Sequence, residues 1–458
     1  MVGFTADSRK WWILAATSGV LGLTVLDETI VGVALPTVRS DLAMGALASH
    51  WVVNAYLLTF TCFVALGGRL GDAIDRGRLF VFGALLFGLS SLACGFAPSG
   101  AFLIGARAIQ GAGAAIIFPA AMSMITLAFK KEEHGVALGL QTNISALFMS
   151  LGPLVGGLLT DTLSWRWIFW VNLPVVIAVV AFVFLAWDKP PPERKPAGKR
   201  DHWGLPTLIV GLSLIVVALM QGADWGWLSG LTLLLFAAGI VLLAIFVMVE
   251  KRLETAFFHV DLLKIATFTG GNIVFFSFQF MKMVIFVFTP LYLQQVMKVS
   301  AIGSGAVLLF AILPTLLTSY GSGRVSDLYG SRAPLLITLV INGASVLLIA
   351  LGVGLQSFWL IVAALIVWGA SLPSFAVPAR KALMNAVPEA ERGQASGINL
   401  TIQMFGGTVG VALCGALLLE TGQFWPVYLT TGALVFITAL FVWQLVEKER
   451  SEVKIHTK

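Results

Sequence analysis

Charged residues are scarce in this chain of 458 residues. Only 11% of the residues are Asp, Glu, Lys or Arg, whereas a typical soluble domain carries about 25%. The chain is 58% hydrophobic and its mean hydropathy is +0.93, which excludes an ordinary soluble protein. Apolar runs of roughly 17–25 residues recur along the sequence. Because these runs are continuous rather than alternating, they predict membrane-spanning helices and not strands.

Cysteine and histidine are scarce as well, and their positions argue against enzyme chemistry. The three cysteines lie in apolar runs without metal-ligand spacing, and the five histidines lie near loops or chain ends. The sequence has no HExxH motif, no nucleophile with a base partner and no cytoplasmic segment long enough for signalling. We therefore disfavour an intramembrane enzyme or a non-transporting sensor, and we expect no cofactor and no metal.

The apolar runs divide the chain into fourteen predicted spans. Lys10 leads directly into the first long span, so we expect no cleavable signal sequence. The approximate limits of the spans are 11–36, 48–68, 79–97, 101–129, 135–160, 167–187, 205–221, 228–249, 268–294, 301–322, 333–353, 357–379, 394–418 and 425–446.

Basic residues gather on one side of these spans. Of the 29 Lys and Arg residues, 24 fall in the N-terminus, the C-terminus and alternate loops. The opposite side has only Arg39, Arg166 and Lys298, and Arg107 and Lys282 lie inside spans. Cytoplasmic loops carry the excess of Lys and Arg, so both termini are predicted to be cytoplasmic in a multi-pass protein of the inner membrane. The net charge of +6 therefore reflects topology, and we expect no nucleic-acid partner.

Two charged connectors divide the spans into groups. The stretch DKPPPERKPAGKR, 188–200, is rich in proline and charge and is typical of a linker, and a second charged stretch covers 250–264. The predicted segments are an N-terminal six-helix bundle at 11–187, a cytoplasmic linker at 188–204, a two-helix insertion at 205–249, a linker at 250–267, a C-terminal six-helix bundle at 268–446 and a cytoplasmic tail at 447–458.

The two predicted bundles share short sequence matches in the same order. GRLGD at 68–72 matches GRVSD at 323–327, and EEHGVALG at 132–139 matches AERGQASG at 390–397. GAGAAIIFP at 111–119 loosely matches GASLPSFAVP at 369–378. These matches predict two duplicated halves, and transporters built from parallel repeats bind substrate at the interface near the bilayer midplane.

The first duplicated motif predicts a cytoplasmic gate in the loops that follow the second span of each half. A glycine and a short charged loop let two helices approach closely, and an acid there can face a helix N-terminus or a basic residue. Such a contact would form a latch that can be broken. The residues of the motif are Gly68, Asp72, Arg76 and Arg78 in the first half, and Gly323, Asp327, Gly330 and Arg332 in the second.

The chain resembles the major facilitator superfamily, and within it the fourteen-helix drug:proton antiporters, which are exporters of the multidrug-resistance type. The resemblance covers nearly the whole chain. It rests on the gate motif and on LDETIVGVALP at 26–36, LIGARAIQGAGAA at 103–115, LGPLVGG at 151–157 and WRWIFWVNLP at 165–174. The gate motif departs from the family pattern, with Ala73 at a position that is usually basic and Asp75 at one that is usually Gly.

The resemblance implies a major facilitator fold of two pseudo-symmetric six-helix bundles with two additional helices between them. It also implies that LGPLVGG is the antiporter motif of the fifth helix, carried by Gly152, Pro153, Gly156 and Gly157. In this family the acid of the first helix and the arginine of the fourth belong to proton coupling and the response to substrate. Those residues are Asp27 and Arg107 here.

The residues themselves support this interpretation. Asp27 lies nine residues before Pro36, which is roughly 13 Å from the outer end of its span, and Arg107 is roughly 10 Å from the same side. Ionisable groups inside spans are costly and usually face a cavity or a partner. An acid beside a cation has a tunable pKa, which suits a proton carrier, although a static ion pair is the alternative.

Two further charged residues in spans have open roles. Glu28 is about 100° around the helix from Asp27, so it could be a second proton site, a cation-selecting charge or neither. Lys282 lies 255 residues after Asp27, the same offset as the repeated gate motif. We therefore hypothesise that Lys282 contacts Asp27 across the two halves, or else binds an anionic group of the substrate.

Polar and aromatic side chains inside the spans are candidates for lining the substrate cavity. Amides in spans need a polar partner, which a water-filled cavity supplies, and aromatic rings provide apolar contact area. The candidates are Asn54, Gln110, Phe118, Asn143, Phe148, Gln279, Lys282, Phe286, Asn399 and Gln403, with Trp51, Tyr56, Phe278, Tyr292 and Phe405 as further aromatics.

We predict a proton-coupled secondary active transporter that exports amphipathic organic compounds, cationic or neutral, by alternating access. Its partners would be this small molecule, protons and the lipid bilayer, and we expect a monomer. A dedicated lipid or metabolite exporter of the same fold is the alternative, and Lys282 favours it if the substrate is anionic. A uniporter or channel is disfavoured by Asp27 with Arg107 and by the antiporter-type Gly-Pro stretch.

Overall fold

A computed structural model gives the arrangement of the helices. It describes residues 6–130, 133–187, 203–252, 259–388 and 391–446. Three predicted segments lie wholly or partly outside the described residues. They are the first linker except for its last two residues, 253–258 of the second linker, and the whole tail at 447–458. All the regular secondary structure in the described part is helical.

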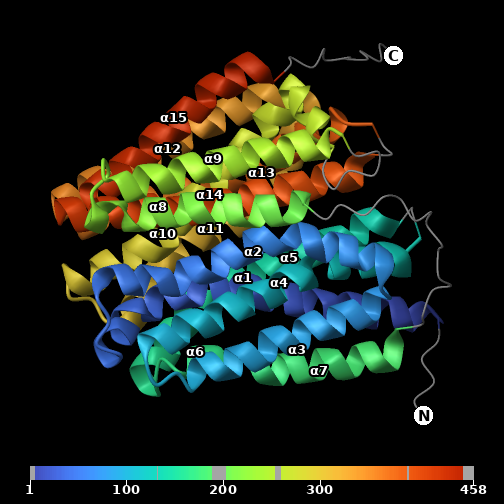
Figure 1. The fold of residues 1–458 in the computed structure, drawn as a ribbon, viewed down its shortest axis with the longest axis horizontal. Coiled ribbons are helices and arrows are strands. Elements are labelled where there is room, and N and C mark those ends of the chain that lie inside the picture. The colour runs from blue at the N-terminus through green and yellow to red at the C-terminus, as the bar shows by residue number, and fades with distance from the viewer. Residues whose placement is uncertain (1–5, 131–132, 188–202, 253–258, 389–390, 447–458) are drawn as a thin grey trace.

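The N-terminal half forms one bundle, shown in the lower part of Figure 1. Its long helices cross the molecule lengthwise, and the sixth predicted span is interrupted at Val171, where α6 passes into α7. The helices are α1 (Ala6–Asp41), α2 (Ala46–Ala73), α3 (Arg76–Gly95), α4 (Gly100–Ala128), α5 (His134–Thr162), α6 (Trp167–Trp170) and α7 (Asn172–Ala186).

The C-terminal half forms a second bundle above the first in Figure 1. A short 3-10 helix, η2 (Val260–Lys264), lies in the predicted second linker and precedes it. The helices of this bundle are α10 (Ala266–Gln295), α11 (Ala301–Tyr329), α12 (Arg332–Gly354), α13 (Phe358–Asn385), α14 (Arg392–Thr421) and α15 (Trp425–Leu445).

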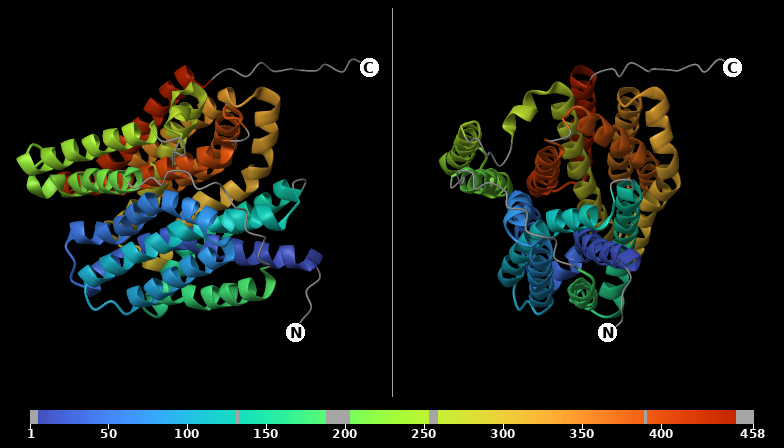
Figure 2. Two further views of the ribbon diagram at one scale, coloured as in Figure 1. Left: turned by 45° about the vertical axis from the view of Figure 1, so that its right-hand side comes forward. Right: turned by 90° about the vertical axis from the view of Figure 1, so that its right-hand side faces the viewer.

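The helix pair α8 (Gly204–Trp225) and α9 (Gly230–Glu250) lies at the flank of the two bundles, as the right-hand view of Figure 2 shows. Helix α8 packs against α2 of the first bundle and α14 of the second. Trp227, between the two helices, donates a hydrogen bond to Glu420 Oε2 (3.0 Å) at the end of α14. The pair therefore covers one side of the interface between the halves.

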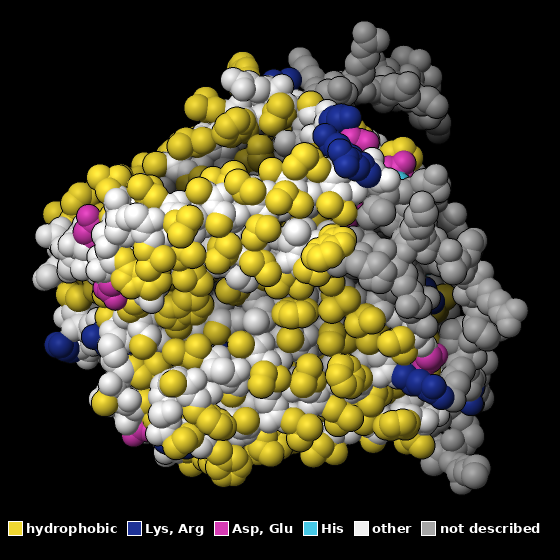
Figure 3. All heavy atoms as spheres, viewed as in Figure 1, with side chains coloured by type: hydrophobic (Ala, Val, Ile, Leu, Met, Phe, Trp, Pro, Cys, Tyr) yellow, Lys and Arg dark blue, Asp and Glu magenta, His cyan; other side chains and the backbone are white. Residues whose placement is uncertain are grey.

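The outer surface suits a bilayer. Hydrophobic side chains cover the flanks of the helices in Figure 3, and the visible charged side chains gather toward the two ends. Within the described residues, thirteen helices are long and apolar enough to cross a membrane, and Ala301–Thr315 is a shorter apolar segment. The predicted fourteen-helix, all-α fold is thus confirmed.

Three local predictions need correction. The first gate motif is helical through Ala73 and the second through Tyr329, so Gly68, Asp72, Gly323 and Asp327 lie on helix ends rather than in loops. Arg380, predicted just beyond the twelfth span, lies inside α13. These helices extend past the apolar runs because backbone hydrogen bonds, and not hydropathy, define a helix.

Candidate functional site

The two neighbouring carboxylates of α1 are both buried. Asp27 has no exposed surface and Glu28 is 6% exposed. Helix α1 contacts α5 and α7 of its own bundle as well as α4, and it also contacts α10 of the other half. Because successive residues of a helix point about 100° apart, the two acids reach different neighbours. One acid therefore points into the first bundle, and the other points toward the interface between the bundles.

Asp27 is held by two residues of α4. Arg107 donates from Nη1 to Asp27 Oδ2, and Gln110 donates from Nε2 to Asp27 Oδ1 (3.0 Å). The same Arg107 nitrogen donates to Gln110 Oε1 (2.7 Å), which fixes the amide between the two charges. The predicted neighbours Asp27 and Arg107 are thus brought together, and the predicted cavity residue Gln110 lies with them, fully buried.

Arg107 is positioned by α2 as well. Its Nε donates to the carbonyl oxygen of Val52 (3.0 Å), and its guanidinium lies 4.3 Å from the centre of the Tyr56 ring. A buried charge is tolerated only when it is paired and hydrogen-bonded, and all these partners belong to the N-terminal bundle. The Asp27–Arg107–Gln110 cluster can therefore move as part of one rigid body.

Glu28 pairs across the two halves. Lys282 of α10 donates from Nζ to Glu28 Oε2 (2.8 Å), and Gln279, one turn earlier, lies 3.5 Å from the same oxygen. The hypothesis of an Asp27–Lys282 contact is therefore wrong: Lys282 pairs with Glu28. The reason is rotational, because Asp27 faces α4 inside its own bundle while Glu28 faces α10.

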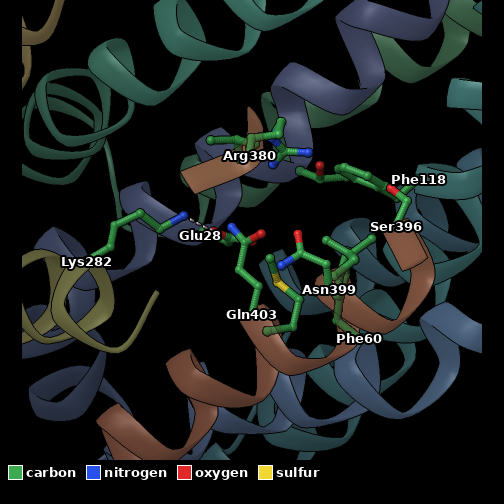
Figure 4. Close-up of a pocket in the computed structure, with 12 residues that line it drawn as sticks. Glu28, Phe60, Phe118, Lys282, Arg380, Ser396, Asn399 and Gln403 are labelled. Carbon is green, nitrogen blue, oxygen red and sulfur yellow. Dashed lines mark hydrogen bonds and ion pairs between the residues drawn. The ribbon is translucent and has the colours of Figure 1, made fainter. Parts of the chain in front are cut away.

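A cavity lies beside the Glu28–Lys282 pair and is partly open to solvent; about 150 Å³ of it is accessible to a water-sized molecule. Figure 4 shows the polar and aromatic side chains gathered around it, with Lys282 and Glu28 pointing toward one another. The first half contributes Thr24, Val25, Glu28, Phe60 and Phe118 to its lining. The second half contributes Lys282, Arg380, Ser396, Asn399, Leu400, Gln403 and Met404.

Of the predicted cavity residues, Phe118, Lys282, Asn399 and Gln403 line this space, and the others do not. Asn143 is exposed on α5, and Phe286 is fully buried with its ring 6.3 Å from that of Trp368. The predicted residues away from the lining are Trp51, Asn54, Tyr56, Gln110, Asn143, Phe148, Phe278, Gln279, Phe286, Tyr292 and Phe405.

Sequence reasoning missed Arg380, Phe60 and Ser396. Arg380 directly follows the last residue of an apolar run, which places it among the loop cations, and Ser396 is a small polar residue one turn before the amides of α14. The available signal was the spacing of Ser396, Asn399 and Gln403, which puts three polar residues on one face of a helix.

The two halves touch closely at one end of the molecule, which we call the closed end and define by Gly32, Gly157, Asp161, Ile302 and Gly305. A Cβ on Gly157 would lie 2.5 Å from the Ala301 carbonyl oxygen, and one on Gly305 only 2.1 Å from that of Pro153. Asp161 accepts a hydrogen bond from the backbone N–H of Ile302 (2.7 Å). Only glycine permits this approach of backbones, so the closed end excludes a passage for substrate.

The comparison with known families decides the class of protein. The profile of the Major Facilitator Superfamily matches residues 17–271 and again 271–458. The chain belongs to the major facilitator superfamily. This major facilitator protein is a transporter and not an enzyme. The first profile match covers the N-terminal bundle from within α1 together with α8 and α9, and the second covers the C-terminal bundle from within α10.

Relatives of this major facilitator protein have names that refer to drug resistance or multidrug transport. The puromycin resistance protein pur8 of Streptomyces alboniger is 33% identical over 89% of this chain and 81% of the relative. The multidrug transporter protein MdtP of Bacillus subtilis is 30% identical over 90% of this chain and 76% of the relative. Among solved structures, the POT family transporter PepTSo superposes with a TM-score of 0.70 at 12% identity, covering 95% of this chain and 97% of that one, which shows a shared fold.

The antiporter motif of this major facilitator protein lies where α5 meets α1 and α11. A Cβ on Gly152 would lie 2.0 Å from Thr29 Oγ1, and one on Gly156 2.7 Å from Ile30. Pro153 is inside α5, and its carbonyl oxygen faces Gly305 of α11. The motif therefore serves close helix packing, with Gly157 reaching the second half at the closed end.

The gate motif lies at the other end of the molecule. Asp75 accepts a hydrogen bond from the Arg78 backbone N–H (2.9 Å) and so caps α3, and Trp187 donates to the same carboxylate (3.4 Å). In the second half, Arg332 donates to the Trp443 carbonyl oxygen, and Gly330 has a φ of 73° where α11 ends. The structure describes neither the side chains of Asp72 and Asp327 nor the surroundings of Gly323, so the predicted latch stays a prediction.

Proposed function

We propose that the protein exports amphipathic organic compounds across the cytoplasmic membrane in exchange for protons, by alternating access of the two bundles. The observation that carries this proposal is the pair of neighbouring carboxylates on α1, of which Asp27 is buried with Arg107 in one bundle and Glu28 is paired across the interface. The direction of transport rests on the relatives, whose names refer to puromycin resistance and multidrug transport.

The distribution of basic residues gives the proposal its orientation. If the basic loops are cytoplasmic, the C-terminal end of α1 faces outward, and with it the closed end. The cavity then lies on the cytoplasmic side of the closed end, toward the residues that end α13 and begin α14. The structure is thus interpreted as an inward-facing state, ready to receive a compound from the cytoplasm. We propose that it acts as a monomer.

Asp27 is the proposed proton carrier. In the state described, the carboxylate is neutralised by Arg107, accepts a hydrogen bond from Gln110 and has no exposed surface. When the closed end opens, a proton from outside binds the carboxylate, and Arg107 keeps its bonds to Gln110 and to the Val52 carbonyl oxygen. Return to the inward-facing state releases the proton to the cytoplasm as the Asp27–Arg107 ion pair forms again.

We propose that the Glu28–Lys282 pair couples substrate binding to the motion of the bundles that moves the proton. It is the ion pair between the described bundles that borders the cavity, so a bound compound can compete with it. Loosening this pair weakens the contact between α1 and α10 and lets the bundles rock. The energy available for the motion comes from differential contacts of the compound in the two states.

Growth and transport assays test the proposal together. Expression in a host without its main efflux pumps should raise survival on a panel of toxic amphipathic compounds, and Asp27→Asn should abolish the gain. In inside-out vesicles, an imposed pH gradient should drive uptake of a protective compound, and collapsing the gradient should stop it. Uptake at the same rate with and without the pH gradient would instead indicate a uniporter and would refute the proposal.

A further inference from the structure

Arg380 is a cation that borders the cavity without an acidic partner. It lies on α13, about three turns beyond Trp368 by helix geometry, and it lines the cavity from the second half. No carboxylate of the described residues lies within ion-pair distance of it, in contrast to Lys282, which Glu28 neutralises. Its guanidinium stacks over Phe275 of α10, 5.0 Å from the ring centre, which holds it in place without cancelling its charge.

The charges around the cavity do not balance. Two cations, Lys282 and Arg380, face one carboxylate, Glu28. Asp27 does not contribute, because it is fully buried and already paired with Arg107. The lining therefore keeps one positive charge in excess, in a region where water is partly replaced by protein and an unpaired charge is costly.

Neutral polar groups of α14 stand near this cation. The side chains of Ser396 and Gln403 line the cavity and donate to no group of the described chain, whereas the Asn399 amide already donates to Asn272 (3.1 Å). The first half adds the rings of Phe60 and Phe118, which lie edge to face with their planes 80° apart. The cavity thus combines a cation that has no carboxylate partner among the described residues, free hydrogen-bonding groups and two aromatic rings.

We propose that the cavity selects amphipathic compounds with an acidic group, whose carboxylate or similar anion binds Arg380 while the apolar body lies against Phe60 and Phe118. A guanidinium matches a carboxylate through two parallel hydrogen bonds, and Ser396 and Gln403 supply neutral contacts. The proposal departs from the cationic or neutral substrate that the sequence analysis expects. It rests on the proposed function for the direction of transport, but not for binding.

The charge balance of such an exchange is favourable. One anion leaving the cell while one proton enters moves two positive charges inward, and an inside-negative membrane potential favours this movement. An acidic compound is thus a cargo that proton exchange can expel strongly. No further coupling ion is required.

Three probes with the same body and different charge test the inference. Binding of pyrenebutyrate, pyrenebutanol and pyrenebutylamine to the purified full chain in detergent is measured by equilibrium dialysis, corrected for micelle partition. The wild type should bind the acid most tightly. Arg380→Gln should weaken binding of the acid about tenfold to a hundredfold, as expected for the loss of one charge-assisted interaction. Binding of the alcohol should be unchanged.

Two variants guard against trivial explanations. Arg380→Lys keeps the charge and should retain part of the preference for the acid. Lys381→Gln removes the same charge from the neighbouring residue, which does not line the cavity, and should behave as the wild type. Binding of the alcohol shows in each variant that the cavity is intact.

Failure of pyrenebutyrate to bind, or equal binding of acid and alcohol by the wild type, would overturn the inference. So would an Arg380→Gln variant that keeps the preference for the acid. These outcomes leave proton-driven export untouched, since binding is measured without a gradient. Conversely, acid-selective binding by a chain that no pH gradient drives would refute the proposed function alone.

Discussion

Asp27 and Glu28 are chemically alike and adjacent, yet their surroundings give them different tasks. Asp27 is enclosed by side chains of α2 and α4 and belongs wholly to one bundle. Glu28 meets Lys282 of the other bundle and borders the cavity. The difference teaches that a rotation of about 100° on a helix suffices to separate a group that stores a proton from a group that senses the interface and its occupant.

The largest expected effect comes from removing the cation of the enclosed site. Arg107→Gln leaves the Asp27 carboxylate buried without a charge partner and removes the stacking on Tyr56, so stability should fall by about 3–5 kcal/mol. Export should be lost as well. Thermal unfolding of the purified protein measures the first effect and vesicle uptake the second.

The double variant Asp27→Asn with Arg107→Gln separates stability from transport. Both charges are gone, so most of the lost stability should return while gradient-driven export stays absent. A double variant as unstable as Arg107→Gln alone would show that the ion pair is not the source of the effect.

The next effect concerns the closed end, where packing and not charge joins the halves. Gly157→Leu inserts a side chain where a Cβ alone would lie 2.5 Å from the Ala301 carbonyl oxygen, and overpacking of this kind costs about 1–3 kcal/mol. The inward-facing state should lose population. A cysteine at buried Ser304 should then react faster with an impermeant maleimide added from outside.

Gly139→Leu is the matched control for that experiment. Gly139 is exposed on the same helix, α5, and a Cβ there would meet no atom within 4 Å. In the Gly139→Leu variant, the cysteine of Ser304→Cys should react with the maleimide at the same rate as in the protein that carries Ser304→Cys alone. Faster labelling in both glycine variants would indicate general loosening of α5 and not a specific opening.

A smaller effect is expected at the Glu28–Lys282 pair. A double-mutant cycle of Glu28→Gln and Lys282→Met should give a coupling free energy of about 1 kcal/mol, in the usual range for a contacting charge pair. The pair borders an open cavity, which weakens the interaction relative to the enclosed site. Thermal unfolding of the four proteins measures the coupling free energy. If the two single substitutions have additive effects, the pair does not join the bundles energetically and cannot couple proton movement to substrate binding.

The smallest effect belongs to an ion pair outside the membrane. Lys10 donates to Glu133 (2.7 Å), and this hydrogen bond holds the pKa of the Glu133 carboxyl below its ordinary value of 4.5. A lowered folded pKa stabilises the protein above the ordinary pKa, and the contribution is lost as the pH falls through the folded value. Glu133→Gln should therefore lower the melting temperature slightly at neutral pH and not at all in acid.

The fold could be predicted from the sequence because apolar runs and the asymmetry of Lys and Arg report directly on spans. Asp27 and Arg107 could be found because ionisable residues in apolar runs stand out. The partner of Lys282 could not be predicted, because a sequence offset gives the depth of a residue in the membrane but not its direction around the helix axis. Asp27 and Glu28 differ mainly in that direction, by about 100°. Arg380 was hidden at the boundary of a run, where α13 continues for more than a turn beyond the apolar stretch.

The most direct measurement compares Asp27→Asn with Glu28→Gln in inside-out vesicles under an imposed pH gradient. If Asp27 carries the proton, Asp27→Asn abolishes gradient-driven uptake while still binding the compound. Glu28→Gln then keeps gradient-driven uptake, at a changed rate. Undiminished gradient-driven uptake by Asp27→Asn would contradict the central claim.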